Sequence, residues 1–348
     1  MPSAADDIRA AIVAAGGAIR FDEYMRLALY GEHGFYTGIG RAGRRGDFIT
    51  SPEIGPLFGA VVARFIDAEW SRAGRPDPFT FVEAGAGPGT LARSVMAAGP
   101  ACRDALRYIA VELSAAQRER HPSDVESVAT LPDEVNVGVI FANELLDNLP
   151  FRIAVYDGEW RDALVAIHTD GSFVEVLGDR LPLGVLPLPA RHGARAPVQD
   201  AAAAWVTTAL ASVRVGCVAV VDYGSTTAQL ARRPYREWLR TYRRNERGEH
   251  YLRAPGLQDI TAEVAVDQLP APASVTTQAD WLRRWGIDDL VDDGKRIWRQ
   301  RAGAPDVAAL LMRSRVGEAE ALLDTAGLGA FLVVEWIVPS DLSSPARN

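Results

Sequence analysis

Lysine is almost absent from this chain. Lys295 is the only lysine in 348 residues, and every other basic side chain is an arginine. Because no Gly-Lys-Ser/Thr loop is present, the sequence excludes a P-loop nucleotide hydrolase. A Schiff-base mechanism would have to use Lys295, whose charged surroundings DDGKRIW are typical of a solvated surface.

Cysteine and histidine are also few. Cys102 and Cys217 are the two cysteines, and their apolar surroundings favour buried small side chains over a disulfide or a metal site. The histidines show no metal-ligand spacing; they are His33, His121, His168, His192 and His250. The sequence therefore predicts no bound metal.

Long apolar runs and an excess of positive charge are missing too. No run reaches the length that crosses a membrane, and MPSAADDIRAA carries acids where a signal peptide carries basic residues. The formal net charge of −8 disfavours binding of nucleic acid by the whole surface. We therefore expect a cytoplasmic protein that enters no membrane and for which nucleic acid is an unfavourable partner.

Apolar strands alternating with helices are what the chain does contain. Five largely apolar runs are separated by helical patterns: FTFVEA, LRYIAVEL, VNVGVIFANELL, GCVAVVDYG and FLVVEWIV. Such runs are typical of a parallel sheet that is covered on both faces. The alternation of apolar strands with helices therefore predicts an α/β fold.

Two further patterns surround this core. FRIAVY, EWRDALVAI and SFVEVL are joined by Asp157-Gly158 and Asp170-Gly171, and this dipeptide favours hairpins, so we expect an antiparallel meander. Before the core, Asp22 is the predicted cap of the helix FDEYMRLALY, and Ser51 is the predicted cap of a helix with Pro52 in its first turn.

A glycine-rich turn follows the first apolar strand, in FVEAGAGPGTL. Gly85, Gly87 and Gly89 follow Glu83, and Thr90 stands where a dinucleotide fingerprint needs its third glycine. The order E-x-G-x-G-x-G instead resembles S-adenosylmethionine-dependent methyltransferases. Turn amides and an acid suit the ammonium and carboxylate of that cofactor, although the glycines could serve only a tight strand-to-helix turn.

The next two strands also end in polar residues. Glu112 ends IAVEL, where a carboxylate would accept hydrogen bonds from the ribose hydroxyls of the cofactor. Asn143, Glu144 and Asp147 follow the third strand in FANELLDNLPF, at the edge where such sheets bind ligands. Many methyltransferases that act on nitrogen place an amide or an acid there, but Asn143 or Asp147 could equally cap a helix.

Several segments together resemble the MidA-like family of S-adenosylmethionine-dependent methyltransferases, relatives of the mitochondrial complex I assembly arginine methyltransferase. They are GEHGFYTGIGRAGRRGDFITSPEIGPLFG, FVEAGAGPGTLA, YIAVELSAAQR, ANELLDNLP, VVDYG, LRTYRR, APGLQDITAEV and TQADWLRRWGI. The resemblance implies a seven-stranded class I, Rossmann-like core with an N-terminal helical region and inserted meander and lid segments. It also implies S-adenosylmethionine as cofactor and protein arginine methylation as activity.

The resemblance divides the chain into six segments. They are an N-terminal helical region and active-site loop at 1–72, a first part of the core at 73–150, the β insertion at 151–198, more core at 199–231, an arginine-rich lid at 232–260 and a last part of the core at 261–348. The expected partner is a protein client that carries the target arginine, and the chain could pair as a homodimer.

The resemblance also assigns site residues. The expected cofactor-binding residues are Glu83, Gly85, Gly87, Gly89, Glu112 and Asn143. Glu144 and Asp147 are expected to hold the substrate guanidinium, because carboxylates orient and localise its charge. Glu53 of SPEI would close the site over it, or would serve only as an acid favoured by the helix dipole.

Three positions depart from the family pattern. Asn245 and Glu263 stand where many relatives have histidine, and Pro56 changes the surroundings of SPEI. These positions lie in the expected additions around the core. The cofactor assignment does not depend on them, but the identity of the target does.

The lid segment has a composition of its own. Eight arginines fall between residues 232 and 253, interleaved with Tyr235, Trp238, Tyr242 and Tyr251. In isolation this pattern is typical of a single-stranded nucleic-acid surface. We favour a lid with an amphipathic helix over YREWLRTYRR. Methylation of RNA or of a small molecule, and a cofactor-binding assembly chaperone without catalysis, remain the alternative functions.

Overall fold

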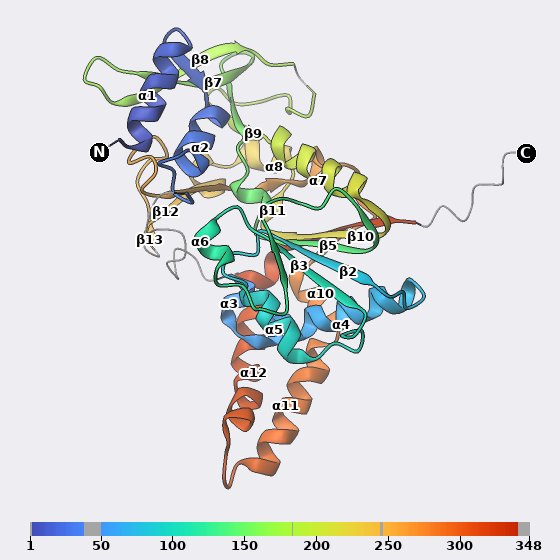
Figure 1. Cartoon of the computed structure of the whole chain (residues 1–348). Helices are drawn as coiled ribbons and strands as arrows, with labels where there is room; N and C mark the ends of the chain where they lie inside the picture. Colours follow the sequence, from blue (N-terminus) through green and yellow to red (C-terminus); the bar gives the residue numbers. More distant parts are fainter. Residues whose placement is uncertain (1, 38–49, 183, 244–245, 340–348) are drawn as a thin grey trace, which may run out of the picture. The chain divides into compact units, whose positions relative to one another are not determined.

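The computed structural model describes residues 2–37, 50–182, 184–243 and 246–339 (Figure 1). Its contacts divide the chain into two compact units that are interleaved along the sequence. Unit 1 comprises Met1–Phe48, Leu145–Thr207 and Tyr223–Ala271, and unit 2 comprises Ile49–Glu144, Thr208–Asp222 and Pro272–Asn348. The six consecutive segments expected from the sequence are therefore distributed over two bodies, which we describe separately.

Unit 2 contains a seven-stranded sheet with the order β16-β17-β10-β5-β2-β3-β4. The strands are β2 (Phe79–Ala84), β3 (Leu106–Val111), β4 (Glu126–Val128), β5 (Val135–Asn143), β10 (Val213–Asp222), β16 (Ser274–Thr277) and β17 (Leu332–Val338). β4, β3, β2, β5 and β10 are mutually parallel, while β17 is antiparallel to both of its neighbours. The strand order reverses between β2 and β5, and open α/β sheets bind ligands at such a switch point.

The core of unit 2 is aromatic. Helix α4 (Pro56–Arg72) places Phe65 5.2 Å from Trp281 of helix α10 (Gln278–Arg284), measured between ring centroids, and Phe65 also packs on Phe141 of β5. Phe141 stacks in turn on Phe81 of β2 at 5.9 Å. Most residues of these strands are buried, which explains their continuous apolar sequence.

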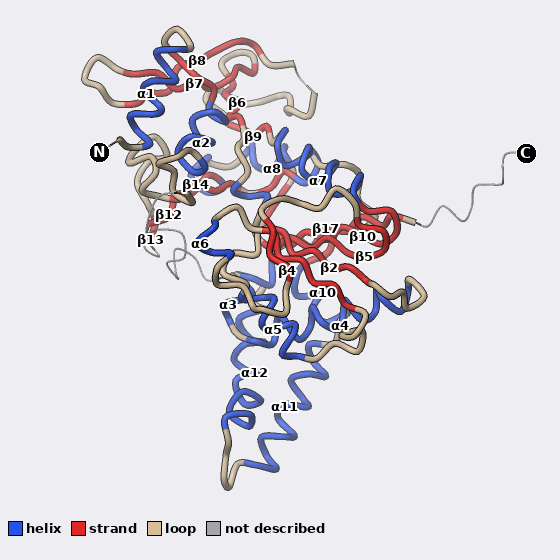
Figure 2. The backbone as a smooth tube through the Cα atoms, in the orientation of Figure 1, coloured by secondary structure: helices blue, strands red, loops and turns tan. Residues whose placement is uncertain are grey.

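Other helices of unit 2 are short, apart from one long pair. The short ones are α3 (Ser51–Ile54), α5 (Thr90–Ala98) and α6 (Ala115–Arg118); α11 (Ile287–Arg301) and α12 (Val307–Leu323) form a helical hairpin. Helix α7 (Asp200–Ser212) begins in the segment of unit 1 and leads into β10 of unit 2. The blue helices and red strands of Figure 2 show these elements along the chain.

Unit 1 is built on a second sheet, in which all strand pairs are antiparallel. β7 (Trp160–Ile167) pairs with β1 (Ala18–Arg20), β6 (Arg152–Tyr156) and β8 (Phe173–Arg180), and β6 pairs with β9 (Arg195–Val198). These strands confirm the predicted meander, with Gly158 and Gly171 at its turns in the left-handed region. Helices α1 (Ala4–Ala14) and α2 (Phe21–Tyr30) share its core, where Phe21 lies 5.4 Å from Phe151.

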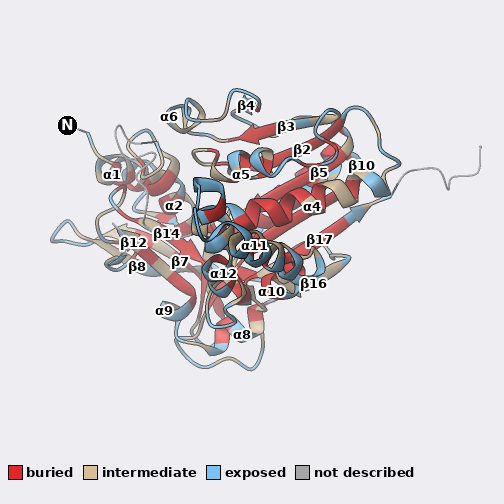
Figure 3. Ribbon diagram, turned by 90° about the horizontal axis from the view of Figure 1, so that it is seen from below, coloured by how far each residue is buried: buried red, intermediate tan, exposed pale blue. Residues whose placement is uncertain are grey.

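Smaller elements complete unit 1. They are the 3-10 turn η1 (Leu146–Asn148), β11 (Gly224–Ser225) paired with β15 (Val264–Ala265), helices α8 (Thr227–Arg232) and α9 (Tyr235–Trp238), and a sheet of β12 (Leu239–Arg243), β13 (Glu246–Arg247) and β14 (Asp259–Ala262). Figure 3 shows buried residues in red along β14 and β7.

The structure corrects the predicted helix over YREWLRTYRR. Only Tyr235–Trp238 is helical, and the chain then enters strand β12, whose residues Leu239 and Thr241 are buried. Pairing with β14 supplies a burial face with a period of two, which overrides a helical pattern of this length.

Both predicted helix caps are also wrong. Helix α2 begins at Phe21, and Asp22 lies in its first turn, where it binds the guanidinium of Arg20. Thr50 forms the cap of α3 through a capping box with Glu53. The hydroxyl of Ser51 instead donates to Gln278 Oε1 over 3.0 Å inside unit 2.

Candidate active site

The glycine turn of unit 2 connects β2 with helix α5. Gly85, Gly87 and Gly89 have φ angles of 72°, 51° and 76°, in the left-handed region that side chains disfavour. The amides of Gly85 and Ala86 both donate to the carbonyl of Val111 over 3.0 Å, which fixes the turn against the end of β3. These glycines are therefore required by backbone geometry.

Glu112 lies directly beside this turn. Its Oε2 accepts from the amide of Gly87 over 3.0 Å, and its Oε1 accepts from the amide of Ser114 over 2.8 Å. Burial raises the pKa of Glu112 above its usual value. Each carboxylate oxygen has a further lone pair, so Glu112 retains the capacity to accept hydrogen bonds from ligand hydroxyls.

Gly87 is held from its other side by a histidine. His121 Nε2 lies 2.8 Å from the carbonyl oxygen of Gly87, and His121 Nδ1 lies 2.9 Å from Ser127 Oγ. The amide and the carbonyl of Gly87 are thus both fixed, by Glu112 and His121 respectively. His121 was not expected at the site from the sequence, because no motif assigns it.

Glu83 occupies a more enclosed position in β2. It is buried, and its Oε2 accepts a 2.6 Å hydrogen bond from the hydroxyl of Tyr108 on β3. Burial raises the pKa of Glu83 to about 7, against the opposing effect of the Tyr108 hydrogen bond. A carboxyl in this state exchanges a proton close to neutral pH.

Two buried oxygens near the turn lack hydrogen-bond partners among the described residues. They are Gln117 Oε1 and Asn143 Oδ1. A Cβ atom added to Gly87 would lie 3.5 Å from Gln117 Oε1, so this acceptor borders the turn itself. Asn143 ends β5, one residue beyond the pair formed by Ala142 with Ala84, the residue just before Gly85. Free acceptors at a glycine turn fit a ligand that brings hydroxyl and ammonium donors.

Glu144 has a strained backbone at the tip of β5. Its φ angle is 54°, which is uncommon for a residue with a side chain, and its amide donates to the carbonyl of Val221 over 2.8 Å. The amide group of Asn143 donates to Glu144 Oε1 over 3.1 Å. Strain of this kind is concentrated at functional sites.

In unit 1, Asp147 lies in a buried polar cluster. Its side chain is buried, and Oδ2 accepts from the hydroxyl of Tyr223 over 2.6 Å and from that of Thr261 over 2.8 Å. Burial raises the pKa of Asp147 in spite of these hydrogen bonds. Two hydroxyl donors on one oxygen fix the orientation of the carboxylate. Because the group is buried, little water is present to screen its charge.

Asp259 belongs to the same cluster and was missed by sequence reasoning. Its Oδ1 accepts from the hydroxyl of Tyr36 over 3.0 Å and from the side-chain amide of Asn148 over 3.1 Å. Burial, and after it the charge of Asp147, raises the pKa of Asp259 to about 7. The available signal was an aspartate that opens a buried strand in the segment APGLQDITAEV.

Glu53, and the three positions that depart from the family pattern, are not part of the two groups of residues described above. Glu53 is exposed, and the nearest donor to its carboxylate is the amide of Thr50 at 3.4 Å, within the capping box. Glu263 is buried and forms ion pairs with Arg233 and Arg240. Pro56 opens helix α4, and Asn245 lies outside the described residues. The structure thus places Glu83, the glycines, Glu112, Asn143 and Glu144 around one edge of a sheet, while the role of Glu53 stays a prediction.

Two features are absent from the described residues. No helix in the described ranges is both long and apolar enough to cross a membrane. Within the same ranges, no three histidine, cysteine, aspartate or glutamate side chains are grouped so that they could hold a metal ion.

Comparisons with known proteins identify the family. Residues 61–283 match the family model described as "Putative S-adenosyl-L-methionine-dependent methyltransferase". The chain is 28% identical over 307 residues to the Drosophila melanogaster protein arginine methyltransferase NDUFAF7 homolog, mitochondrial, with 75% of this chain and 68% of that protein covered. It is 25% identical over 324 residues to the Danio rerio protein arginine methyltransferase NDUFAF7, mitochondrial, with 79% and 75% covered.

A solved structure supports the same assignment. The crystal structure of a Burkholderia thailandensis protein with bound S-adenosyl-homocysteine superimposes with a TM-score of 0.81 and 29% identity, covering 96% of this chain and 91% of that one. The expected methyltransferase fold is therefore confirmed. S-adenosyl-homocysteine is what remains of S-adenosylmethionine after its methyl group has been transferred.

The predicted cytoplasmic location is wrong by the same comparisons. The Drosophila and Danio relatives are both named as mitochondrial proteins. Acidic residues near the first methionine were therefore not a valid guide to location.

The matched family model covers most of the chain. The chain belongs to this family of S-adenosylmethionine-dependent methyltransferases, and S-adenosylmethionine is its cofactor.

Proposed function

We propose that this enzyme methylates a guanidinium nitrogen of an arginine in a protein client. The observation that carries the proposal is the pair of carboxylates in unit 1, Asp147 and Asp259, each bound by tyrosine hydroxyls. The name of protein arginine methyltransferase carried by relatives at 25% and 28% identity supports the same substrate.

A cation is the ligand that such a pair favours. The charge of Asp147 raises the pKa of Asp259, so the pair is unfavourable when both groups are ionised. A guanidinium is planar, cationic and able to donate several hydrogen bonds in a fixed geometry. Its charge would offset the repulsion between the two carboxylates and allow both of them to accept.

The cofactor site is proposed in unit 2. Glu112 would accept from the ribose hydroxyls, and the amides of the turn at Gly85, Gly87 and Gly89 would lie against the amino-acid end of the cofactor. Asn143 Oδ1, which has no partner among the described residues, would accept from its ammonium group. When bound, S-adenosylmethionine supplies a methyl group on a positively charged sulfur.

Methyl transfer to a guanidinium requires the protein to perform three functions. Carboxylates must orient the guanidinium, so that one nitrogen points along the line of displacement. They must also localise the positive charge away from that nitrogen, because a delocalised cation is a weak nucleophile. As the nitrogen–carbon bond forms and the carbon–sulfur bond breaks, the nitrogen must lose a proton, and a carboxylate with a pKa near 7 can accept it.

In this proposal Asp147 holds the guanidinium, Asp259 is the proton acceptor, and Glu144 keeps the substrate-binding role expected from the sequence. Glu53 would close the site over the substrate. The strained backbone of Glu144 supports a functional role for its side chain. A glycine at this position would relieve the strain, so Glu144→Gly should be more stable and yet inactive.

The test is transfer of labelled methyl groups to proteins from a lysate of the source cells that lacks this enzyme. Mass spectrometry of the labelled proteins should find methylarginine, and Glu144→Gln should abolish the label. Glu237→Gln, an exposed glutamate in α9, is the control and should leave the label unchanged. Label that enters RNA or small molecules, and not arginine, would contradict the proposal.

A further inference from the structure

A small cavity opens in unit 1 between helix α9 and the strands that follow it. Its volume is about 230 Å³. Six of the residues that line it are Tyr235, Arg236, Thr241, Arg247, His250 and Tyr251. Ligand pockets that enclose drug-sized molecules measure roughly 300–1,000 Å³, so this cavity has room for a side chain and not for a whole ligand of that kind.

Aromatic rings form one wall of the cavity. The ring centroids of His250 and Tyr251 are 4.0 Å apart, and that of Tyr235 is 6.0 Å from Tyr251. The hydroxyl of Tyr251 donates to Glu175 over 2.7 Å, which fixes the ring. The wall therefore has a ring whose hydroxyl is held by a carboxylate.

Two arginines at the cavity have no carboxylate partner among the described residues. Arg247 Nη1 donates to the carbonyl of Arg236 over 3.3 Å, and Arg236 Nε lies 3.3 Å from the hydroxyl of Tyr235. Glu249 also lines the cavity; it is exposed, as both arginines are, and no ion pair joins it to either of them among the described residues. The wider segment 232–253 holds eight arginines against three glutamates, in a chain whose net charge is −8. Arg236 and Arg247 against Glu249 leave the lining of the cavity with an excess of positive charge.

The pKa of His250 depends on the charges around this cavity. Burial lowers this pKa, the charge of Glu175 opposes this effect, and the positive charges of Arg236, Arg195 and Arg253 lower the pKa further. An anion in the cavity would oppose those charges. His250 therefore offers a local readout of an anion that binds there.

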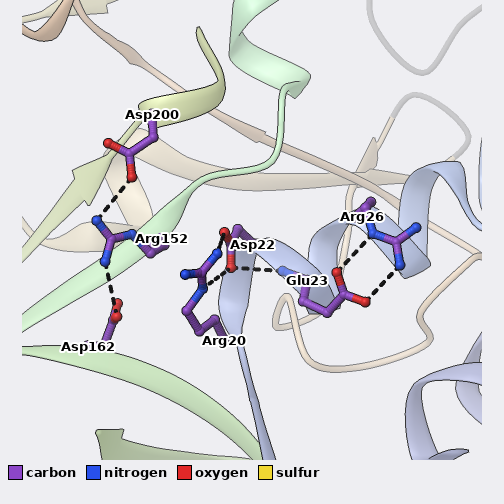
Figure 4. Close-up of polar contacts among 7 residues, drawn as sticks. All are labelled: Arg20, Asp22, Glu23, Arg26, Arg152, Asp162 and Asp200. Carbon is purple, nitrogen blue, oxygen red and sulfur yellow. Dashed lines mark hydrogen bonds and ion pairs between the residues drawn. The ribbon is translucent and has the colours of Figure 1, made fainter. Parts of the chain in front are cut away.

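In a second cavity of unit 1, by contrast, the arginines are paired with carboxylates (Figure 4). It measures about 240 Å³, and its guanidinium groups are already paired. Arg152 bridges Asp162 at 3.2 Å and Asp200 at 3.0 Å, and Arg26 is held by Glu23 at 2.7 Å. These internal pairs leave little charge to attract an ion, in contrast to Arg236 and Arg247.

The positive cavity shares strand β12 with the carboxylate cluster. Thr241 lines the cavity, and the next residue, Tyr242, pairs directly with Asp259 of β14. Successive residues of a strand point to opposite faces. Tyr242 also pairs directly with Arg247 of β13, so Arg247 and Asp259 lie on the face of Tyr242, separated by about two strand spacings, roughly 10 Å.

We propose that this cavity binds an acidic side chain of the protein client. The inference rests on the proposed function in taking a protein as the substrate. The carboxylates at Asp147 and Asp259 would select the target arginine, and Arg236 and Arg247 would select an aspartate or glutamate elsewhere on the client. Opposite charges at two separated points fix the orientation of a partner as well as attracting it.

A binding assay tests the proposal without any methyl transfer. The probe is a fluorescent peptide of glycine and serine with four glutamates, compared with the same peptide in which glutamines replace them. The glutamate peptide should bind more tightly. Arg236→Glu combined with Arg247→Glu should weaken its binding by about tenfold or more, since reversal replaces attraction with repulsion. Arg232→Glu, an exposed arginine of the same segment that does not line the cavity, should change it less than twofold.

Nuclear magnetic resonance of His250 locates the binding. The pKa of His250 should rise when the glutamate peptide is added and should not change with the glutamine peptide. Equal weakening by Arg232→Glu, or an unchanged His250, would overturn the proposal. Tighter binding of a ten-nucleotide RNA that is lost in the same double variant would replace the acidic client with nucleic acid.

The outcomes separate this proposal from the proposed function. If the double variant binds the peptide normally while methylarginine still forms on the client, the cavity assignment is wrong and the arginine activity stands. If peptide binding depends on Arg236 and Arg247 but no methylarginine is found, the anion site stands and the substrate assignment is wrong.

Discussion

The hydroxyl of Tyr223 donates to Oδ2 of Asp147 over 2.6 Å. Tyr223 follows strand β10 directly, and Asp147 lies in the turn after β5, so segments far apart in the sequence meet in this bond. The phenol stabilises the ionised carboxyl and opposes the effect of burial on its pKa. Tyr223 therefore helps to keep Asp147 charged.

Tyr223→Phe should weaken substrate binding more than protein stability. Loss of the phenol donor raises the pKa of Asp147 further, so less of the carboxylate is ionised to bind a cation. We expect kcat/KM for the arginine substrate to fall by about tenfold, which corresponds to the loss of one charge-assisted hydrogen bond. Steady-state kinetics at pH 7 and pH 9 check this. A loss that is not smaller at pH 9 would contradict the explanation.

Asp259 should give the reaction a pH dependence near neutrality. Its pKa is about 7, so the carboxyl is protonated below that pH and cannot attract a guanidinium or accept its proton. In the wild type, kcat/KM should rise with pH up to about 7 and then level off. Asp259→Asn should lower kcat/KM by about a hundredfold at pH 8 and remove this inflection. A variant that keeps the wild-type pH profile would exclude Asp259 as the group that titrates.

The glycine turn can be tested with a matched pair of alanine variants. Gly87 and Gly158 have φ angles of 51° and 77°, and an added Cβ would meet nothing closer than 3.5 Å at either position. Both variants should therefore lose about 1–2 kcal/mol of unfolding free energy through backbone strain. Only Gly87→Ala should weaken S-adenosylmethionine binding in calorimetric titration. Equal affinities in the two variants would mean that the turn does not bind the cofactor.

Glu83 should make unit 2 less stable as the pH rises. Its pKa is raised from 4.5 to about 7 in the folded protein, so its contribution to stability is fully present below pH 4.5 and is lost as the pH rises through 7. At 1.36 kcal/mol for each pKa unit, the full loss is about 3 kcal/mol.

Urea unfolding at pH 5 and pH 8 measures this effect. Glu83→Gln stays neutral and can still accept from Tyr108, so it should lose less stability than the wild type over that interval. Glu126→Gln is the control, because Glu126 pairs with Arg107 at the exposed surface of the same sheet. A Glu83→Gln protein that loses as much stability as the control would contradict the prediction.

The strands of the methyltransferase sheet could be predicted because each carries its own signal. FTFVEA and VNVGVIFAN are largely apolar; β2 is buried throughout, and β5 is buried over most of its length. The left-handed turn at Gly85 likewise follows from local sequence. These features depend on residues that are neighbours in the chain.

Asp259 could not be assigned in this way. Its hydrogen-bond partners Tyr36 and Asn148 are 223 and 111 residues away in the sequence, and no local pattern predicts that these residues contact Asp259. The same is true of Thr241, whose burial in β12 depends on pairing with Ile260 of β14. Long-range pairing also decided that the N-terminal helices join the meander in unit 1 instead of forming a separate region.

The alternation of the two units along the chain governs how the protein can be made. β10 pairs with β17 through Val218 and Trp336, yet the ribosome must synthesise all of the last segment of unit 1 between these two strands. Until β17 emerges, the nascent chain carries an open, apolar strand edge that other chains could bind. Neither unit can be expressed from one uninterrupted stretch of the gene, so truncated versions of this enzyme should aggregate, and only chains that extend through residue 338 should fold.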